Sequence, residues 1–268
     1  MRPFATFRIV MLLAAALLAV DARPAAAQGF AALISPPRFE LTAKPGATVR
    51  QVLEVSNRSA APAHYRIHTA DFDLTAQYGV TFHENLQPNS CRPWVALERP
   101  DVTLPGGGTI RYRFEIAVPK DAPAGECRFG LLVEGADSTV AQAGGVQLPI
   151  SGRIGVIVYV VIGDAAPTLE VFGPHVVTAN GKRVPSLRVH NSGNAHGRMS
   201  GFLSGKDANG VRYDFTPSDF PILPGEDREV YFMPSLPNND SPTLTFPVTV
   251  RGTLEWAGGT VPVDERFE

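Results

Sequence analysis

The chain has 268 residues, enough for two domains that each bury a hydrophobic core. Its formal net charge of -2 excludes the strongly basic surface that nucleic acids and anionic membranes bind. The 25 glycines and 24 prolines favour short strands joined by tight turns, so the composition predicts an all-β protein.

The N-terminus has the features of a secretory signal peptide. Arg2 and Arg8 supply positive charge, residues 9–20 form an apolar run, and residues 25–27 are the small side chains of a cleavage site. The apolar run is too short for a stable transmembrane anchor, which is the alternative interpretation. We therefore expect residues 1–27 to be removed and the mature protein to be exported without membrane insertion.

The first half of the mature chain predicts seven strands with regular turns. They are expected at 32–34 continuing into 38–41, then at 49–55, 65–69, 94–97, 110–118 and 127–133, and within 144–163. Pro36 and Pro37 interrupt the first strand, and because proline donates no ladder hydrogen bond, we expect the chain to change sheets there. This pattern is typical of an immunoglobulin-like sandwich.

The chain has two cysteines, Cys91 and Cys127. In an exported protein a single pair favours a disulfide over a metal site. Two buried free thiols are the alternative.

The segment 144–163 has the most informative pattern. Apolar side chains occupy one parity, at Val146, Leu148, Ile150, Ile154, Val156, Val158 and Val160. Arg153 and internal glycines exclude a membrane helix, and the alternation predicts one strand of up to about 17 residues, roughly 55 Å long. Strands of this length are rare, so we expect part of it to leave the sheet and present an unpaired apolar edge.

The second half shows the same pattern of short strands and tight turns after a predicted hinge at 163–167. Strands are expected at 169–171, 186–190, 199–204, 212–215, 229–233, 246–256 and 260–263. The turn at Asn209-Gly210 is typical of a hairpin. We predict an N-terminal domain over 28–163 and a C-terminal domain over 164–268, both immunoglobulin-like sandwiches.

Two arginines are candidates for a binding site. Arg38 lies in the first strand and Arg153 in the last strand of the first domain, each on the parity opposite the core side chains. First and last strands of a sandwich can lie side by side, and two guanidinium groups near an interdomain cleft would bind a carboxylate. Solvated sheet positions are the alternative.

Catalytic motifs are lacking. The chain has no GxSxG, no phosphate-binding glycine loop followed by lysine, and no HExxH. His64 and His68 would lie about 13 Å apart on a strand, too far to share a metal. We predict no catalytic residue, no metal site and no cofactor.

Several short segments carry a family resemblance through their order and spacing. They are Ile34–Leu41, Leu53–Asn57, Trp94 before Leu104–Gly106, Arg153–Tyr159, and Asn191–His196. Together they resemble periplasmic pilus-assembly chaperones of the chaperone–usher (PapD-like) family, and the last segment is similar to the archaic branch.

The resemblance implies a boomerang of two sandwiches with a peptide cleft between them. It implies that Arg38 and Arg153 anchor the C-terminal carboxylate of a pilin. It also implies that Val146, Leu148 and Ile150 are donor residues that fill the groove left by a strand missing from the pilin.

The function expected from these features is that of a non-enzymatic periplasmic chaperone. It would bind pilus subunits by donor-strand complementation and deliver them to an outer-membrane usher, in fimbrium biogenesis and cell wall organization. A self-capping dimer is expected when no client is bound. The alternative is a secreted two-domain module that binds a cell-surface or polymeric partner without a folding role.

Overall fold

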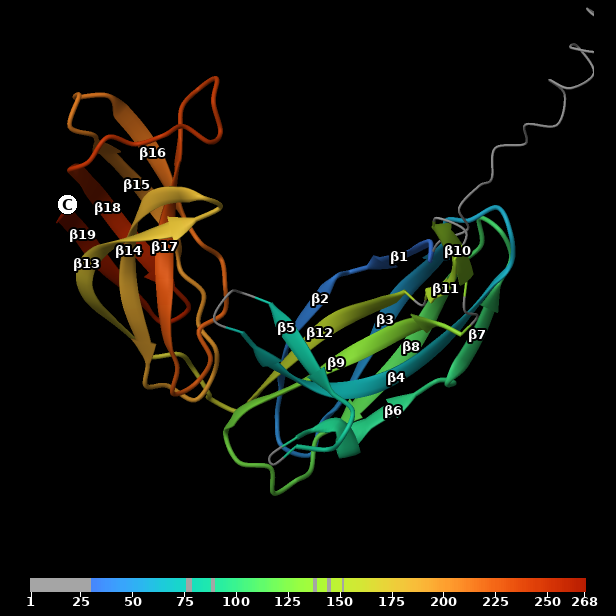
Figure 1. The fold of residues 1–268 in the computed structure, drawn as a ribbon. Coiled ribbons are helices and arrows are strands. Elements are labelled where there is room, and N and C mark those ends of the chain that lie inside the picture. The colour runs from blue at the N-terminus through green and yellow to red at the C-terminus, as the bar shows by residue number, and fades with distance from the viewer. Residues whose placement is uncertain (1–29, 76–78, 88–89, 137–138, 144–145, 151) are drawn as a thin grey trace, which may run out of the picture.

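The computed structural model describes residues 30–75, 79–87, 90–136, 139–143, 146–150 and 152–268, with the backbone alone for 139–143 and 146–150. The described chain forms two β-sandwich domains that meet at an angle (Figure 1). The predicted signal peptide, residues 1–27, lies outside the described residues. No helix among the described residues is long and apolar enough to cross a membrane.

The first domain contains two facing sheets. One sheet has the order β1 (Ala32–Ser35), β3 (Thr48–Asn57), β8 (Thr109–Ala117) and β6 (Val95–Leu97). The other has the order β2 (Arg38–Ala43), β12 (Arg153–Ile162), β9 (Gly125–Gly135), β4 (Ala63–Leu74) and β5 (Val80–His83), and β7 (Asp101–Leu104) also pairs with β4. The helical element described in this domain is the 3-10 turn η1 (Arg92–Trp94).

The proline pair divides the first strand between the two sheets. β1 pairs with β3 in an antiparallel sense, whereas β2 pairs with β12 in a parallel sense. The peptide bond between Ser35 and Pro36 is cis. The predicted change of sheet at this point is confirmed.

Alternation along the strands decides which side chains form the first core. Tyr112, Phe114 and Ile116 of β8 are buried, as are Val156 and Val158 of β12 from the opposite sheet. The core also contains the predicted disulfide between Cys91 and Cys127, whose Cα atoms lie 5.7 Å apart, so that prediction is confirmed.

The prediction of one continuous strand over 144–163 is wrong. The segment contains two strands, β11 (Val146–Ile150) and β12, and β11 pairs with β10 (Thr139–Ala143) in a separate two-stranded sheet. This hairpin lies at the end of the first domain that is remote from the second domain (Figure 1).

The register of strand pairing differs on the two sides of the break. Glu134 pairs with Arg153, whereas Thr139 pairs with Ile150, so the two ladders are offset by two residues. Phe30 packs at the same point, because a Cβ on Gly152 would lie 2.1 Å from the Cβ of Phe30.

The second domain is one folded sheet with two layers. Its order is β13 (Leu169–Ala179), β14 (Lys182–Asn191), β17 (Asp227–Ser235), β16 (Arg212–Pro217), β15 (Ser200–Lys206), β18 (Val248–Trp256) and β19 (Gly259–Phe267). β17 belongs to both layers, since Val230 pairs with β14 and Met233 pairs with β16. The predicted fold class, all-β with two immunoglobulin-like sandwiches in tandem, is confirmed.

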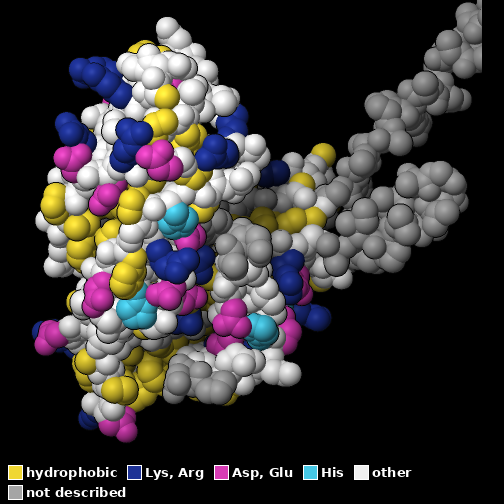
Figure 2. Space-filling view, turned by 60° about the vertical axis from the view of Figure 1, so that its left-hand side comes forward, with side chains coloured by type: hydrophobic (Ala, Val, Ile, Leu, Met, Phe, Trp, Pro, Cys, Tyr) yellow, Lys and Arg dark blue, Asp and Glu magenta, His cyan; other side chains and the backbone are white. Residues whose placement is uncertain are grey.

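Side chains of both charges are intermixed on the face turned forward in Figure 2, where arginine and lysine lie among aspartate and glutamate. This agrees with the net charge of -2.

Candidate functional site

Part of the outward face of β12 meets the second domain. Tyr159 and Ile157 point away from the core valines of this strand. Tyr159 packs in a small cluster with Phe72 of β4 and with Leu223 of the second domain. This face therefore connects the sandwich surface to the domain junction.

The structure places Arg38 and Arg153 on this face but does not bring them together. In the parallel pairing of β2 with β12, Arg38 lies opposite Ile157. Arg153 is four residues before Ile157, which corresponds to roughly 13 Å along the strand. Paired residues point to the same side of a sheet, so both guanidinium groups share one face at different ends of it.

Phe82 covers the face between the two arginines. A Cβ on Gly130 or on Gly155 would lie only 2.6 Å or 2.2 Å from ring carbons of Phe82, so the ring fills space that these two glycines leave open. β5, which carries Phe82, was not predicted. The short alternation Val80-Thr81-Phe82-His83 after Gly79 was the available signal.

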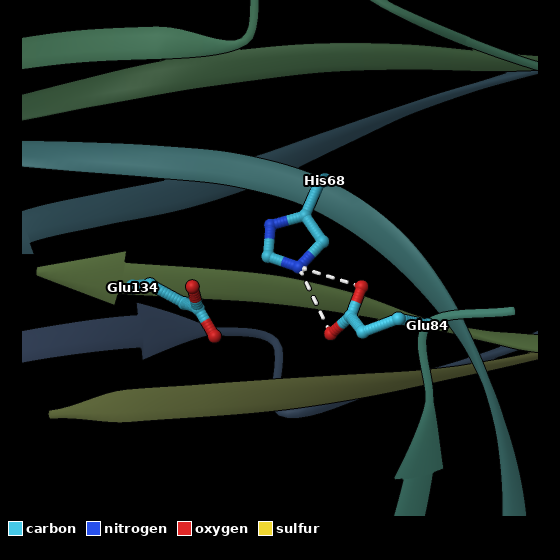
Figure 3. Close-up of side chains that lie close together, drawn as sticks. All are labelled: His68, Glu84 and Glu134. Carbon is cyan, nitrogen blue, oxygen red and sulfur yellow. Dashed lines mark hydrogen bonds and ion pairs between the residues drawn. The ribbon is translucent and has the colours of Figure 1, made fainter. Parts of the chain in front are cut away.

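Acidic side chains hold Arg153 in place. Its Nη1 lies 3.4 Å from Oε1 of Glu134 and 3.7 Å from Oε1 of Glu84, and its guanidinium carbon lies 5.5 Å from the ring centroid of Phe82. His68 Nε2 is 3.4 Å from both carboxylate oxygens of Glu84 (Figure 3).

Ligand atoms of His68, Glu84 and Glu134 all lie within 4.8 Å of one another. These are groups that can bind a metal ion, and sequence spacing did not indicate the cluster because its members lie on different elements. Arg153 supplies positive charge beside both carboxylates, so a cation at this point would compete with the arginine.

A histidine from the second domain enters the junction. His196 donates its main-chain N–H to Oε2 of Glu126 at 2.8 Å, and its ring Nδ1 bonds to the same oxygen. The imidazole stacks on Tyr159 with ring centroids 4.1 Å apart. Burial raises the pKa of Tyr159 to about 12, although the nearby Arg198 opposes this shift.

The loop that presents His196 is built around Asn191. Its amide nitrogen donates to the carbonyl oxygens of Ala195 and Ile222, both at 2.8 Å. Gly193 is required beside it, since a Cβ there would lie 2.4 Å from the carbonyl oxygen of Ala166. The Asn191–His196 segment thus orients a loop toward the first domain.

Arg38 meets a different arginine at the junction. Nε of Arg38 lies 2.8 Å from Oε1 of Glu40, and Nε of Arg198 donates to the same oxygen at 3.1 Å. Glu40, Tyr159 and Arg198 line a cavity of about 480 Å³ between the domains. No sequence pattern indicated Arg198, which is 158 residues from Glu40.

The predicted donor positions lie on β11. Their backbone partners on β10 are Ala143 for Val146, Ala141 for Leu148 and Thr139 for Ile150. The side chains of these strands lie outside the described residues.

Comparison with known proteins gives matches among solved structures only. No protein-family model and no curated protein matches the chain. Similar structures include the YadV chaperone, with 15% identity over 88% of this chain and 98% of that chain and a TM-score of 0.46. The E. coli chaperone DraB has 16% identity over 89% of this chain and 97% of that chain, with a TM-score of 0.44. The structure of the Salmonella enterica SafA pilin in complex with the SafB chaperone has 14% identity over 88% of this chain and 96% of that chain, with a TM-score of 0.45.

Proposed function

We propose that this chain is a periplasmic chaperone of the chaperone–usher type, which binds pilus subunits and completes their fold with a donated strand. The observation that carries this proposal is the position of β11. It belongs to neither sheet of the sandwich, and among the described strands it pairs with β10 alone.

A strand in this position is suited to pairing with another protein. One edge of β11 carries β10, and the other has no strand partner in the described part of the chain. An open edge provides main-chain donors and acceptors, and alternate side chains provide specificity when an extended partner is added. Val146, Leu148 and Ile150 occupy one parity of this strand and are the proposed donor residues.

The cationic groups on the face of β12 are the proposed contacts for the acidic end of the client. Arg38 and Arg153 share this face, and β12 leads from the hairpin directly to the domain junction. A guanidinium group offers a carboxylate two parallel hydrogen bonds, so it is suited to bind a chain terminus.

The proposal includes the remaining partners and the location. The clients are pilin-like subunits, and the complex is delivered to an outer-membrane usher. A self-capping dimer would cover β11 when no client is present. Residues 1–27 direct export to the periplasm, and the protein binds and releases its client without a catalytic step.

Hydrogen exchange tests the donor role of β11 directly. The protein would be co-expressed with a candidate pilin-like subunit, and the complex would be compared with the free chain. We expect the β11 amides that do not donate to β10 to exchange rapidly in the free monomer, at concentrations below those that favour a dimer, and slowly in the complex, because the client strand accepts hydrogen bonds from them. Exchange in β14 of the second domain is the internal control and should not change. Co-purification without protection of β11 would reject donor-strand pairing.

A further inference from the structure

His68, Glu84 and Glu134 come together from three elements on the outward face of the first domain. In the register of the sheet, Glu134 of β9 lies opposite Arg66 of β4 on one side and opposite Arg153 of β12 on the other. His68 is the next outward residue of β4 after Arg66. Glu84 directly follows β5, which pairs with β4. The topology therefore places one imidazole and two carboxylates at one point (Figure 3).

The spacing of these groups suits one divalent cation. The ligand atoms of the three side chains lie within 4.8 Å of one another. Zinc binds imidazole nitrogen and carboxylate oxygen at about 2.0–2.2 Å, so the ligand atoms around one tetrahedral ion lie about 3.4 Å apart. Nε2 of His68 is already 3.4 Å from both oxygens of Glu84. The side chain of Glu84 is 58% exposed, so its rotation can close the cluster on an ion without a change in the strands.

Arg153 already supplies positive charge to the two carboxylates. Its Nη1 lies 3.4 Å from Oε1 of Glu134 and 3.7 Å from Oε1 of Glu84. One atom of the guanidinium thus takes the position between the carboxylates that a metal ion would take. The side chain of Arg153 is 44% exposed, so the guanidinium can leave for water at little cost in desolvation. A divalent ion neutralises two carboxylates more completely than one guanidinium does.

We propose that His68, Glu84 and Glu134 form a zinc site in which Arg153 occupies the cation position until the ion displaces it. Three protein ligands and one water molecule complete four-coordinate zinc. The imidazole favours zinc over calcium and magnesium, which prefer oxygen ligands alone. A bound ion would join the end of β5 to β4 and β9 and so stabilise this edge of the sheet. The site goes beyond the proposed function, and its test needs no client.

Calorimetric titration of the untagged mature protein with zinc chloride tests the site. We expect one ion per chain, a rise in melting temperature when the ion is bound, and loss of binding in His68→Gln. His64→Gln is the matched control and should keep wild-type affinity, because His64 is an exposed histidine on the same strand. Calcium and magnesium at the same concentrations should give no signal. Circular dichroism would verify folding of each variant.

Removal of Arg153 predicts tighter binding, a result that loss of folding does not explain. Arg153→Gln should bind zinc roughly tenfold more tightly, because a position that is free about one tenth of the time has its affinity reduced in that proportion. Arg66→Gln is the control, since it removes the same charge from the other neighbour of Glu134. Arg66 is turned toward Asp101 at 3.6 Å, so its loss should change the affinity by less than about threefold.

No zinc binding by Arg153→Gln, wild-type affinity in His68→Gln, or equal affinity in wild type and Arg153→Gln would each overturn the proposal. Tighter binding by Arg153→Gln that is lost when His68→Gln is added would support it. Protection of β11 by a client is measured separately, so either proposal can fail without the other.

Discussion

His196 and Glu126 join the two domains through two hydrogen bonds to one oxygen. The main-chain N–H of His196 lies 2.8 Å from Oε2 of Glu126, and its ring Nδ1 bonds to the same atom. The side chain of Glu126 is fully buried and its other oxygen has no hydrogen-bond partner among the described residues. This pair is therefore one of the contacts that hold the two domains at their angle.

Replacing His196 with alanine should destabilise the domain junction. Alanine keeps the main-chain N–H bond to Glu126 but removes the ring bond, and losing one partner of a buried acceptor costs about 1–3 kcal/mol. We therefore expect a lower calorimetric transition temperature and a broader range of shapes in small-angle X-ray scattering. His190→Ala is the control, because His190 pairs with Asp227 at an exposed site where such pairs contribute about 0–1 kcal/mol. Equal effects of the two variants would contradict a role for His196 in holding the domains.

The triple variant Val146→Ser, Leu148→Ser and Ile150→Ser should lose client binding and keep its melting temperature. Each apolar side chain buried against a client contributes roughly 1.5–3 kcal/mol, so the complex would lose about 5 kcal/mol or more. Affinity for a pilin-like subunit and thermal unfolding would be measured on the same samples.

Val158→Ser is the control variant, and it should lower the melting temperature. Val158 is fully buried in the first core, and the cavity and buried hydroxyl should cost about 3 kcal/mol, which lowers the melting temperature by roughly 10 °C. If the triple variant melted as early as Val158→Ser, β11 would belong to the core of its own domain.

Arg38→Ala should abolish retention of the client, because Arg38 is one of the two proposed contacts for its acidic end. Arg153→Ala tests the second contact in the same co-purification assay. We expect the Arg38→Ala, Arg153→Ala double variant to be little worse than either single variant, since both act on the same end of the client. Normal retention of the client by Arg153→Ala would contradict its role as an anchor, whatever Arg38→Ala does.

The disulfide between Cys91 and Cys127 should stabilise the first domain. It joins residues 36 apart in sequence, and closing a loop of this length contributes about 4 kcal/mol through the unfolded state. We expect Cys91→Ala with Cys127→Ala to unfold at a lower denaturant concentration. Intact mass after alkylation without reductant should show no labelled thiol in protein from the periplasm.

Tyr159 should make the protein less stable at alkaline pH. The ordinary tyrosine pKa is 10.0, and burial raises that of Tyr159 to about 12. Between these values the unfolded chain loses a proton that the folded chain keeps, so stability falls as pH rises. Tyr159→Phe has no phenol group to titrate at this position. Between pH 8 and pH 11, the free energy of unfolding measured in urea should therefore fall by about 1.4 kcal/mol less in Tyr159→Phe than in wild type. Identical losses in both proteins would contradict the raised pKa.

Local patterns alone determined which side chains form the core of each sandwich. Alternation at 110–118 predicted the buried Tyr112 and Phe114, because successive side chains of a strand point to opposite faces. Pro36 and Pro37 predicted the change of sheet for an equally local reason, since proline lacks a ladder donor.

Only the tertiary structure decided how the functional groups combine. A pattern of period two continues through residues 146–160, but the pairing divides it into β11 and β12, whose ladders are offset by two residues, and Phe30 packs against Gly152 between them. Parity placed Arg38 and Arg153 on one face, but the register of β2 against β12 set them apart. Arg198 reaches Glu40 because the second domain contacts the first at the junction. Contacts between residues this far apart in sequence depend on topology and packing, which have no local signature.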